Sequence, residues 1–208
     1  MIEAPESALK TRYPLMEYFY TIQGEGFHTG KPAYFIRLGG CDVGCTWCDV
    51  KESWPAEAHP MVSVKEMIDF VKASGAELAV ITGGEPLMYD LGPLTSVFRN
   101  EGIRCHVETS GTHALSGSWD WICFSPKRFK APLPEFYPSA HELKVVVNHR
   151  NDLRWAESHA EKVNSSCLLF LQPEWDKAEE LLPLIIDYVK ENPKWRISLQ
   201  THKYIHVP

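Results

Sequence analysis

The chain lacks long apolar runs, an excess of basic residues and a dense set of cysteines. No uninterrupted apolar stretch approaches the roughly 18–20 residues that a membrane-spanning helix requires. Lys and Arg number 21 against 27 Asp and Glu, giving a formal charge of −6. Nucleic-acid-binding proteins usually concentrate basic charge instead. We therefore expect no membrane association and no nucleic-acid partner.

No secretory leader is predicted, because the first residues show no basic start followed by an apolar stretch. The sequence contains no internal repeat or low-complexity tract, and 44% of its 208 residues are hydrophobic. Six cysteines are too dilute for a disulfide framework, and in a reducing compartment clustered cysteines more often bind metal. We expect a cytoplasmic protein with one domain spanning residues 1–208.

After a polar N-terminal leader, alternating strand-like and helix-like segments predict an α/β fold with a parallel sheet. Strands are predicted at 34–38, 78–82, 103–109, 121–125, 142–147, 166–172 and 196–200, and helices at 63–74, 91–100, 151–163 and 176–191. The proline-containing segment 127–138 is predicted to be an irregular loop. A complete (β/α)₈ barrel takes about 250 residues. The expected fold is therefore an incomplete TIM-type (β/α) barrel.

Polar or glycine-rich clusters follow five of these strands, where ligands bind in parallel sheets and barrels. The clusters are 83–86, 108–111, 125–127, 172–174 and 200–203. Loops are polar in general, which would explain one or two of the clusters. Five together predict one ligand site.

Three cysteines, Cys41, Cys45 and Cys48, lie within eight residues on a glycine-containing loop after the first predicted strand. A structural zinc ion usually takes four protein ligands, whereas a four-iron cluster held by three cysteines leaves one iron open. The spacing favours the cluster, with zinc as the alternative. The other three cysteines lie in apolar segments and are predicted to be small core residues: Cys105, Cys123 and Cys167.

The cysteine loop, of C-x3-C-x-aromatic-C form with Trp47 as the aromatic, resembles that of radical S-adenosylmethionine enzymes. The sequence Gly83-Gly84-Glu85-Pro86 resembles the second motif of that superfamily. The resemblance implies a radical SAM fold, a [4Fe–4S] cluster on the three cysteines and S-adenosylmethionine on the open iron. We expect the two glycines to let the backbone approach the cofactor. Glu85 either contacts the cofactor or orients the loop.

Three further segments, 20–26, 35–41 and 199–204, resemble the 7-carboxy-7-deazaguanine synthases of queuosine biosynthesis, a tRNA modification pathway. The resemblance implies a lyase that converts 6-carboxy-5,6,7,8-tetrahydropterin to 7-carboxy-7-deazaguanine with release of ammonia. It also implies a homodimer and an electron donor such as flavodoxin. No catalytic residue is implied beyond the cluster and the cofactor radical.

Position by position, the resemblance implies two sets of binding residues. Substrate would contact Ile22, Gln23, Gly24, Glu25, Arg37, Thr82, His202 and Pro208. Cofactor would contact Gly83, Gly84, Glu85, Glu108, Ser110, Ser125, Pro126, Lys127, Gln172, Pro173, Glu174 and Trp175. Without the resemblance, Gln23 and Glu25 are equally compatible with a solvated turn, and His202 with the protein surface.

The resemblance also implies a Mg²⁺ site near Asp49 and Val50, where the family usually has threonine in place of Val50. Valine has no oxygen, and magnesium prefers oxygen ligands and water. Substrate oxygens and water, with Asp49 in an outer shell, would then have to hold the ion. We expect turnover to respond little to added Mg²⁺.

Two other functions share part of this pattern. A radical activating enzyme has the cysteine loop but seats a glycyl segment of a partner protein, and it is expected to lack the 23–25 and 201–204 segments. A zinc or electron-transfer module would leave the five polar clusters without a purpose. The sequence favours the deazaguanine synthase over both.

Overall fold

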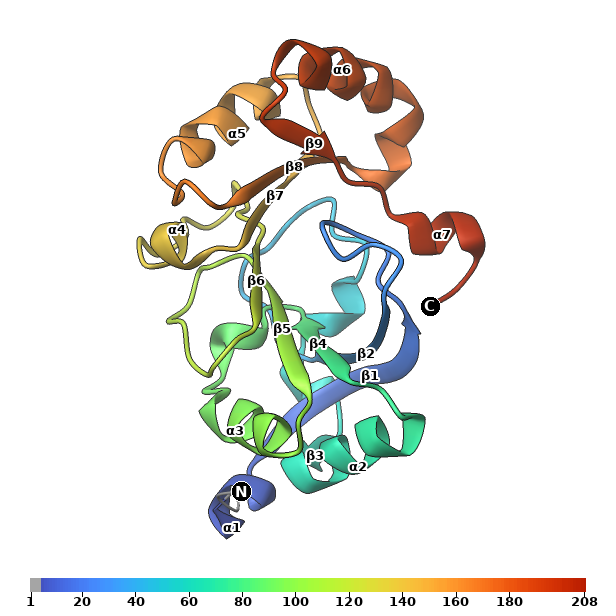
Figure 1. The fold of residues 1–208 in the computed structure, drawn as a ribbon, viewed down its shortest axis with the longest axis vertical. Helices are drawn as coiled ribbons and strands as arrows, with labels where there is room; N and C mark the ends of the chain where they lie inside the picture. Colours follow the sequence, from blue (N-terminus) through green and yellow to red (C-terminus); the bar gives the residue numbers. More distant parts are fainter. Residues whose placement is uncertain (1–4) are drawn as a thin grey trace.

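A nine-stranded sheet with the order β3-β1-β2-β4-β5-β6-β7-β8-β9 organises residues 5–208, which the computed structural model describes (Figure 1). The strands are β1 Arg12–Ile22, β2 Pro32–Leu38, β3 Met61–Ser63, β4 Leu78–Gly83, β5 Arg104–Thr109, β6 Trp121–Phe124, β7 Glu142–Val147, β8 Leu168–Pro173 and β9 Trp195–Ile197. Strand β1 is antiparallel to β2 and β3, and every neighbouring pair from β2 to β9 is parallel. Within the described residues the edge strands β3 and β9 do not pair. This open, curved sheet confirms the predicted partial barrel.

The longer helices lie along the outer face of the curved sheet (Figure 1). They are α2 Val64–Ser74, α3 Gly92–Asn100, α5 Asn151–Ala160 and α6 Ala178–Glu191. Shorter elements are α1 Glu6–Lys10, α4 Phe136–Ser139, α7 Thr201–Ile205 and the 3₁₀ turns η1 Lys51–Ser53, η2 Ala56–Ala58, η3 Pro86–Met88 and η4 Trp175–Lys177. Helix α2 begins at a reciprocal Ser63–Glu66 capping box and ends at the left-handed Gly75, as its sequence predicts. None of the helices in residues 5–208 is long and apolar enough to cross a bilayer.

Five sequence predictions need correction. The polar leader contains the eleven-residue strand β1, which pairs antiparallel with β2 along most of its length and with β3 at Arg12–Pro14. The segment 127–138 is mostly irregular, but it ends in the short helix α4. The predicted strand 196–200 stops at Ile197, and the chain turns into α7. The helix predicted at 151–163 ends at Ala160, and the one predicted at 176–191 starts with a 3₁₀ turn.

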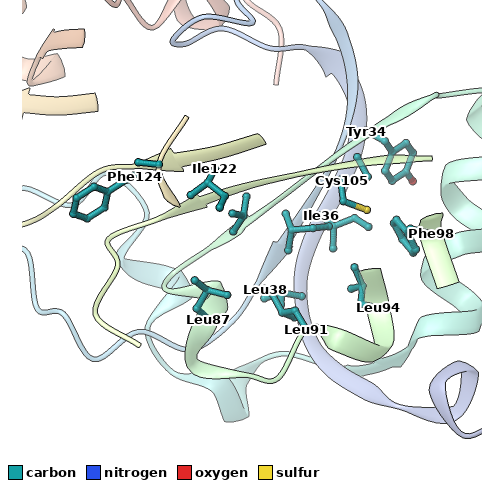
Figure 2. Close-up of a cluster of buried hydrophobic side chains, with 14 of the residues drawn as sticks. Tyr34, Ile36, Leu38, Leu87, Leu91, Leu94, Phe98, Cys105, Ile122 and Phe124 are labelled. Carbon is teal, nitrogen blue, oxygen red and sulfur yellow. The ribbon is translucent and has the colours of Figure 1, made fainter. Parts of the chain in front are cut away.

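Residues of the parallel strands alternate between two environments. On β7, Leu143, Val145 and Val147 pack into the main core between sheet and helices, so Lys144 and Val146 lie on the opposite, inner face. The other strands repeat this pattern, and part of the resulting core, from β2, η3, α3, β5 and β6, is shown in Figure 2. The inner face is therefore free to carry polar side chains.

A cluster of aromatic and histidine rings fills the interior below the carboxyl ends of the strands. The loop between β1 and β2 places His28 with its ring centroid 4.5 Å from those of His106 and Trp121, and Trp121 stacks on His141. His106 is only 6% exposed. Burial, together with the charges of His28 and nearby basic residues, lowers the pKa of His106 to about 3. The folded protein thus holds this imidazole neutral.

Stability should therefore fall on acidification. The unfolded chain takes up a proton on His106 near its ordinary pKa of 6.5, whereas the folded chain resists protonation until about pH 3. The contribution of His106 is complete above pH 6.5 and is lost as the pH falls toward 3, by about 3 kcal/mol at pH 4. Urea unfolding at pH 7.5 and pH 4 should show a smaller loss in His106→Phe than in the wild type. Equal losses in the two proteins would contradict this assignment.

Candidate active site

A cavity of about 250 Å³ opens at the carboxyl ends of the parallel strands. Arg37, Thr82, Glu108, Ser125 and Gln172 reach it from β2, β4, β5, β6 and β8 or from the residue just beyond. All but one of the predicted substrate, cofactor and cluster residues line it, as do Asp49 and Val50. The exception is Pro126, which is buried between two lining residues. The five polar clusters do meet at one place.

The Gly83-Gly84 turn packs directly against the cysteine loop. The backbone N–H of Gly84 donates to the Leu38 carbonyl at 3.1 Å, and that of Glu85 donates to the Gly40 carbonyl at 2.9 Å. A Cβ added to Gly84 would lie 2.4 Å from the Gly40 oxygen and 2.6 Å from the Cys41 Cβ. The glycines are therefore needed for contact between the two motifs. The sequence predicted only that they let the backbone approach the cofactor.

Glu85 orients the strand-end loops. Its side chain is almost fully buried and accepts hydrogen bonds from the Thr109 hydroxyl at 2.6 Å and from the backbone N–H groups of Leu87 at 3.2 Å and Ser110 at 2.8 Å. These bonds tie the turn after β4 to the end of β5. Of the two roles left open by the sequence, these bonds match loop orientation.

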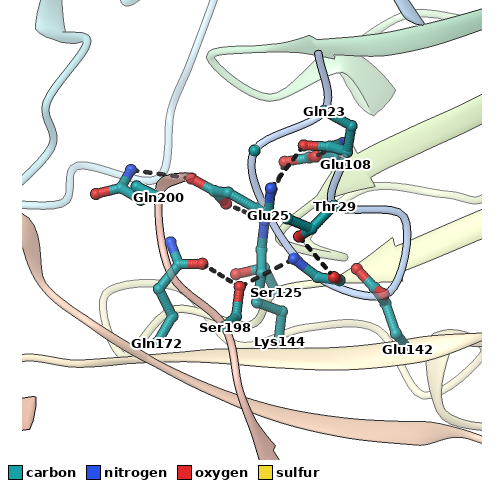
Figure 3. Close-up of polar contacts among 12 residues, drawn as sticks. Gln23, Glu25, Thr29, Glu108, Ser125, Glu142, Lys144, Gln172, Ser198 and Gln200 are labelled. Carbon is teal, nitrogen blue, oxygen red and sulfur yellow. Dashed lines mark hydrogen bonds and ion pairs between the residues drawn. The ribbon is translucent and has the colours of Figure 1, made fainter. Parts of the chain in front are cut away.

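Two carboxylates and a lysine of the cavity lining lie close together (Figure 3). Lys144 forms ion pairs with Glu25 and, at 3.2 Å, with Glu108. Burial raises the pKa of Glu25, but the charge of Lys144 and hydrogen bonds from Lys144 and Gln200 outweigh it and lower the pKa to about 2. Glu25 is therefore an ionised acceptor and not a residue of a solvated turn.

The segment after β9 crosses the cavity and is held to the Gly24 turn. The Thr201 N–H and hydroxyl both donate to the Gly24 carbonyl at 2.9 Å. His202 packs so closely on Gly24 that a Cβ there would lie 2.1 Å from its Nδ1. At its end, the Pro208 carbonyl accepts a 3.2 Å hydrogen bond from Thr21. His202 and Pro208 thus lie at the cavity and not on a distant surface.

Comparison with known sequences shows the family of this chain. A profile of the radical SAM superfamily matches residues 35–122. A 7-carboxy-7-deazaguanine synthase of Flavobacterium psychrophilum is 55% identical over 94% of this chain and 92% of its own length. One of Synechocystis is 47% identical over the whole of both chains. The chain belongs to the 7-carboxy-7-deazaguanine synthase family.

Structural comparison agrees with this membership. The crystal structure of QueE from Escherichia coli superposes with a TM-score of 0.79 at 32% identity, covering 90% of this chain and 93% of that one. As a radical SAM protein, a member of the 7-carboxy-7-deazaguanine synthase family uses a [4Fe–4S] cluster and S-adenosylmethionine.

Three cysteines of this family member lie where such a cluster would bind. Cys41, Cys45 and Cys48 are free thiols along one wall of the cavity. Among residues 5–208, however, no three His, Cys, Asp or Glu side chains gather closely enough to hold one metal ion. A zinc ion draws sulfur ligands to about 2.3 Å, whereas a four-iron cluster distributes its cysteines over separate irons. Between the two alternatives, membership of the radical SAM superfamily favours the cluster over zinc.

Sequence reasoning missed Lys144 and four apolar lining residues, Phe19, Phe35, Trp54 and Val146. Lys144 lies inside an apolar strand, and a lone lysine at an inward position of that strand is the signal that would have found it. Phe19 lies on β1, which the sequence did not identify as a strand.

Replacement of Gly84 by alanine should separate the two motifs. Gly84→Ala inserts a methyl group against Gly40 and Cys41, so we expect a loss of about 1–3 kcal/mol in stability and a large loss of bound iron after anaerobic reconstitution. The matched control is Gly92→Ala, whose added Cβ meets only the mobile end of Asp90 at 3.1 Å. Urea unfolding and iron content per chain measure the two effects. Normal iron content in Gly84→Ala would refute the packing argument.

Proposed function

We propose that this chain is a 7-carboxy-7-deazaguanine synthase that converts 6-carboxy-5,6,7,8-tetrahydropterin to 7-carboxy-7-deazaguanine with release of ammonia, in queuosine or related deazapurine biosynthesis. The main supporting observation is one cavity that joins the three-cysteine loop to Arg37 and to the partly buried pair Glu25 and Glu108. Glu108, which the resemblance assigned to the cofactor, is assigned to the substrate in this proposal. A pterin has a donor-rich amino and amide edge and, in this substrate, a carboxylate. The cavity offers acceptors for the first and a cation for the second.

The substrate-binding side of the proposal rests on the Gln23–Glu25 turn and the strand ends facing it. Glu25 would accept from the N–H edge of the pterin ring, and the guanidinium of Arg37 would bind the carboxylate. Arg37 is itself held in place by Glu17, 2.6 Å from its Nε, and by the Gly83 carbonyl, 3.4 Å from its Nη1. Ile22, Gln23, Gly24, Thr82, His202 and Pro208 would complete the enclosure.

The cofactor-binding side rests on the opposite wall. Cys41, Cys45 and Cys48 would hold the cluster, which supplies the electron that cleaves S-adenosylmethionine to a 5′-deoxyadenosyl radical. The ammonium of Lys127 donates to the Ser125 carbonyl and hydroxyl at 2.7 and 2.6 Å. It would face the anionic part of the cofactor. The backbone at 83–84 and the side chains at 172–175 would enclose the remainder.

Several finer properties belong to the same proposal. We treat residues 1–208 as one radical SAM domain, acting in the cytoplasm as a homodimer with a flavodoxin-like electron donor. Size-exclusion chromatography with light scattering tests the dimer. Turnover driven by reduced flavodoxin, compared with a chemical reductant, tests the donor.

Anaerobic turnover tests the activity itself. Protein reconstituted with iron and sulfide should bind about four irons per chain and, with reductant, S-adenosylmethionine and 6-carboxy-tetrahydropterin, form 7-carboxy-7-deazaguanine and ammonia. Cys45→Ala should lose at least about 1000-fold in rate, because the cluster loses a ligand, while the core variant Cys105→Ala should keep its cluster. A loaded protein that cleaves S-adenosylmethionine without forming product would refute the assigned substrate but not the superfamily.

Magnesium dependence is a separate prediction. Val50 lines the cavity without a side-chain oxygen, and the nearby Asp49 carboxylate is paired with Lys203 at 2.9 Å. We propose that Mg²⁺ is held weakly, so added Mg²⁺ should change the wild-type rate less than about threefold. Val50→Thr supplies a hydroxyl and should increase that response. A strict Mg²⁺ requirement at the full wild-type rate would contradict the proposal.

A further inference from the structure

Lys144 is a buried lysine on the inner face of β7. Its side chain is 4% exposed, and its ammonium lies between Glu25, from the loop after β1, and Glu108, from β5 (Figure 3). The two acids come from segments far apart in the sequence, so no local structure requires them to meet. The lysine connects them through its charge.

The two carboxylates are held in matching ways. Glu25 has one oxygen on Lys144, while the other accepts from Gln200 Nε2 at 2.9 Å. Glu108 likewise has one oxygen 3.2 Å from Lys144, and the other accepts from Gln23 Nε2 at 3.0 Å. A carboxylate has about four acceptor positions, so each keeps capacity for a ligand. Both remain part of the cavity lining.

The charge balance of this cluster depends on the lysine. Two carboxylates sharing a buried site repel each other, and one of them tends to take up a proton unless a cation is present. A third acid, the buried Glu142, stands two residues from Lys144 on the same inner face of β7. A protonated or displaced carboxylate no longer offers the same acceptors to a donor-bearing ligand.

We propose that Lys144 is a positioning residue that keeps Glu25 and Glu108 aimed into the cavity as paired acceptors for adjacent N–H groups of the substrate. The ligand class is then a heterocycle with a 2-amino-4-oxopyrimidine edge, which presents two neighbouring donors. The inference rests on the proposed function, since it names the part of the pterin that the pair recognises. It adds that selectivity for this edge depends on a residue that has no need to touch the substrate.

The test compares two fluorescent probes that differ only at this edge. 6-Carboxypterin carries the 2-amino group, and 6-carboxylumazine carries an oxygen acceptor there instead. Their dissociation constants would be measured by fluorescence with cluster-loaded protein and S-adenosylmethionine, without reductant, so that no turnover occurs. A site that hydrogen-bonds a donor rejects an analogue lacking it, so the wild type should prefer 6-carboxypterin by at least about 100-fold.

Lys144→Met keeps the length of the side chain and removes its charge. We expect its preference for 6-carboxypterin to fall below about tenfold. The matched control is Val145→Ala, the next residue on β7, which is buried in the core and points away from the cavity. That variant should lose stability but keep the wild-type preference, which separates positioning from general destabilisation.

Lys144→Met leaves two carboxylates without their cation and could prevent folding. A second variant keeps the test valid in that case. Adding Glu108→Gln removes one of those charges, so Lys144→Met/Glu108→Gln should fold better than Lys144→Met and still show the reduced preference. A wild-type preference in either Lys144 variant would overturn the role of Lys144. A wild type that binds neither probe would instead overturn the proposed pterin substrate.

Discussion

The alternation of side chains along parallel strands is the constraint on which the rest of this structure depends. Successive residues of a strand face opposite sides, and the outer side must be apolar because helices cover it. The inner side of a curved, open sheet has no such requirement. Lys144 and Val145 show the consequence, since neighbouring residues lie in a polar cavity and in the apolar core. One strand can thus build the core and the site at the same time.

The close contact between two turns places the cysteine loop above this inner face. The Gly84 turn follows β4 and the cysteine loop follows β2, and the two strands are parallel neighbours. Their turns therefore leave the sheet side by side, and the absence of a side chain at Gly84 lets the backbones touch. Glu85 then extends the same support to Thr109 and Ser110 at the end of β5. Sheet topology, and not loop flexibility, fixes where the cysteines lie.

The sequence was sufficient to predict the parallel strands and the ligand site, because both produce local patterns of residues. Apolar runs ending in glycine or polar clusters predicted β4, β5 and β7 within one residue at each end. Strand β1 was not predicted because Pro14 and Glu17 interrupt its apolar residues and no regular alternation of buried and exposed positions marks it. The pairing of Lys144 with Glu25 was also not predicted, because the two residues are 119 positions apart in the sequence and only the fold brings them together.

The distribution of cations gives the cavity two different ends. Of the Lys and Arg side chains among residues 5–208 that line it, Arg37 and Lys144 each pair with a carboxylate, whereas Lys127 bonds only to Ser125. Burial raises the pKa of Cys45 to about 11, and the charge of Lys127 opposes that rise. The Lys127 ammonium, which has no carboxylate ion pair within the described part of the chain, therefore lies close to Cys45, whereas Glu25 and Glu108 both contact Lys144. Thiolates and the carboxylate of S-adenosylmethionine suit the first end, and a ring edge rich in N–H donors suits the second, so one cavity can orient two ligands toward each other.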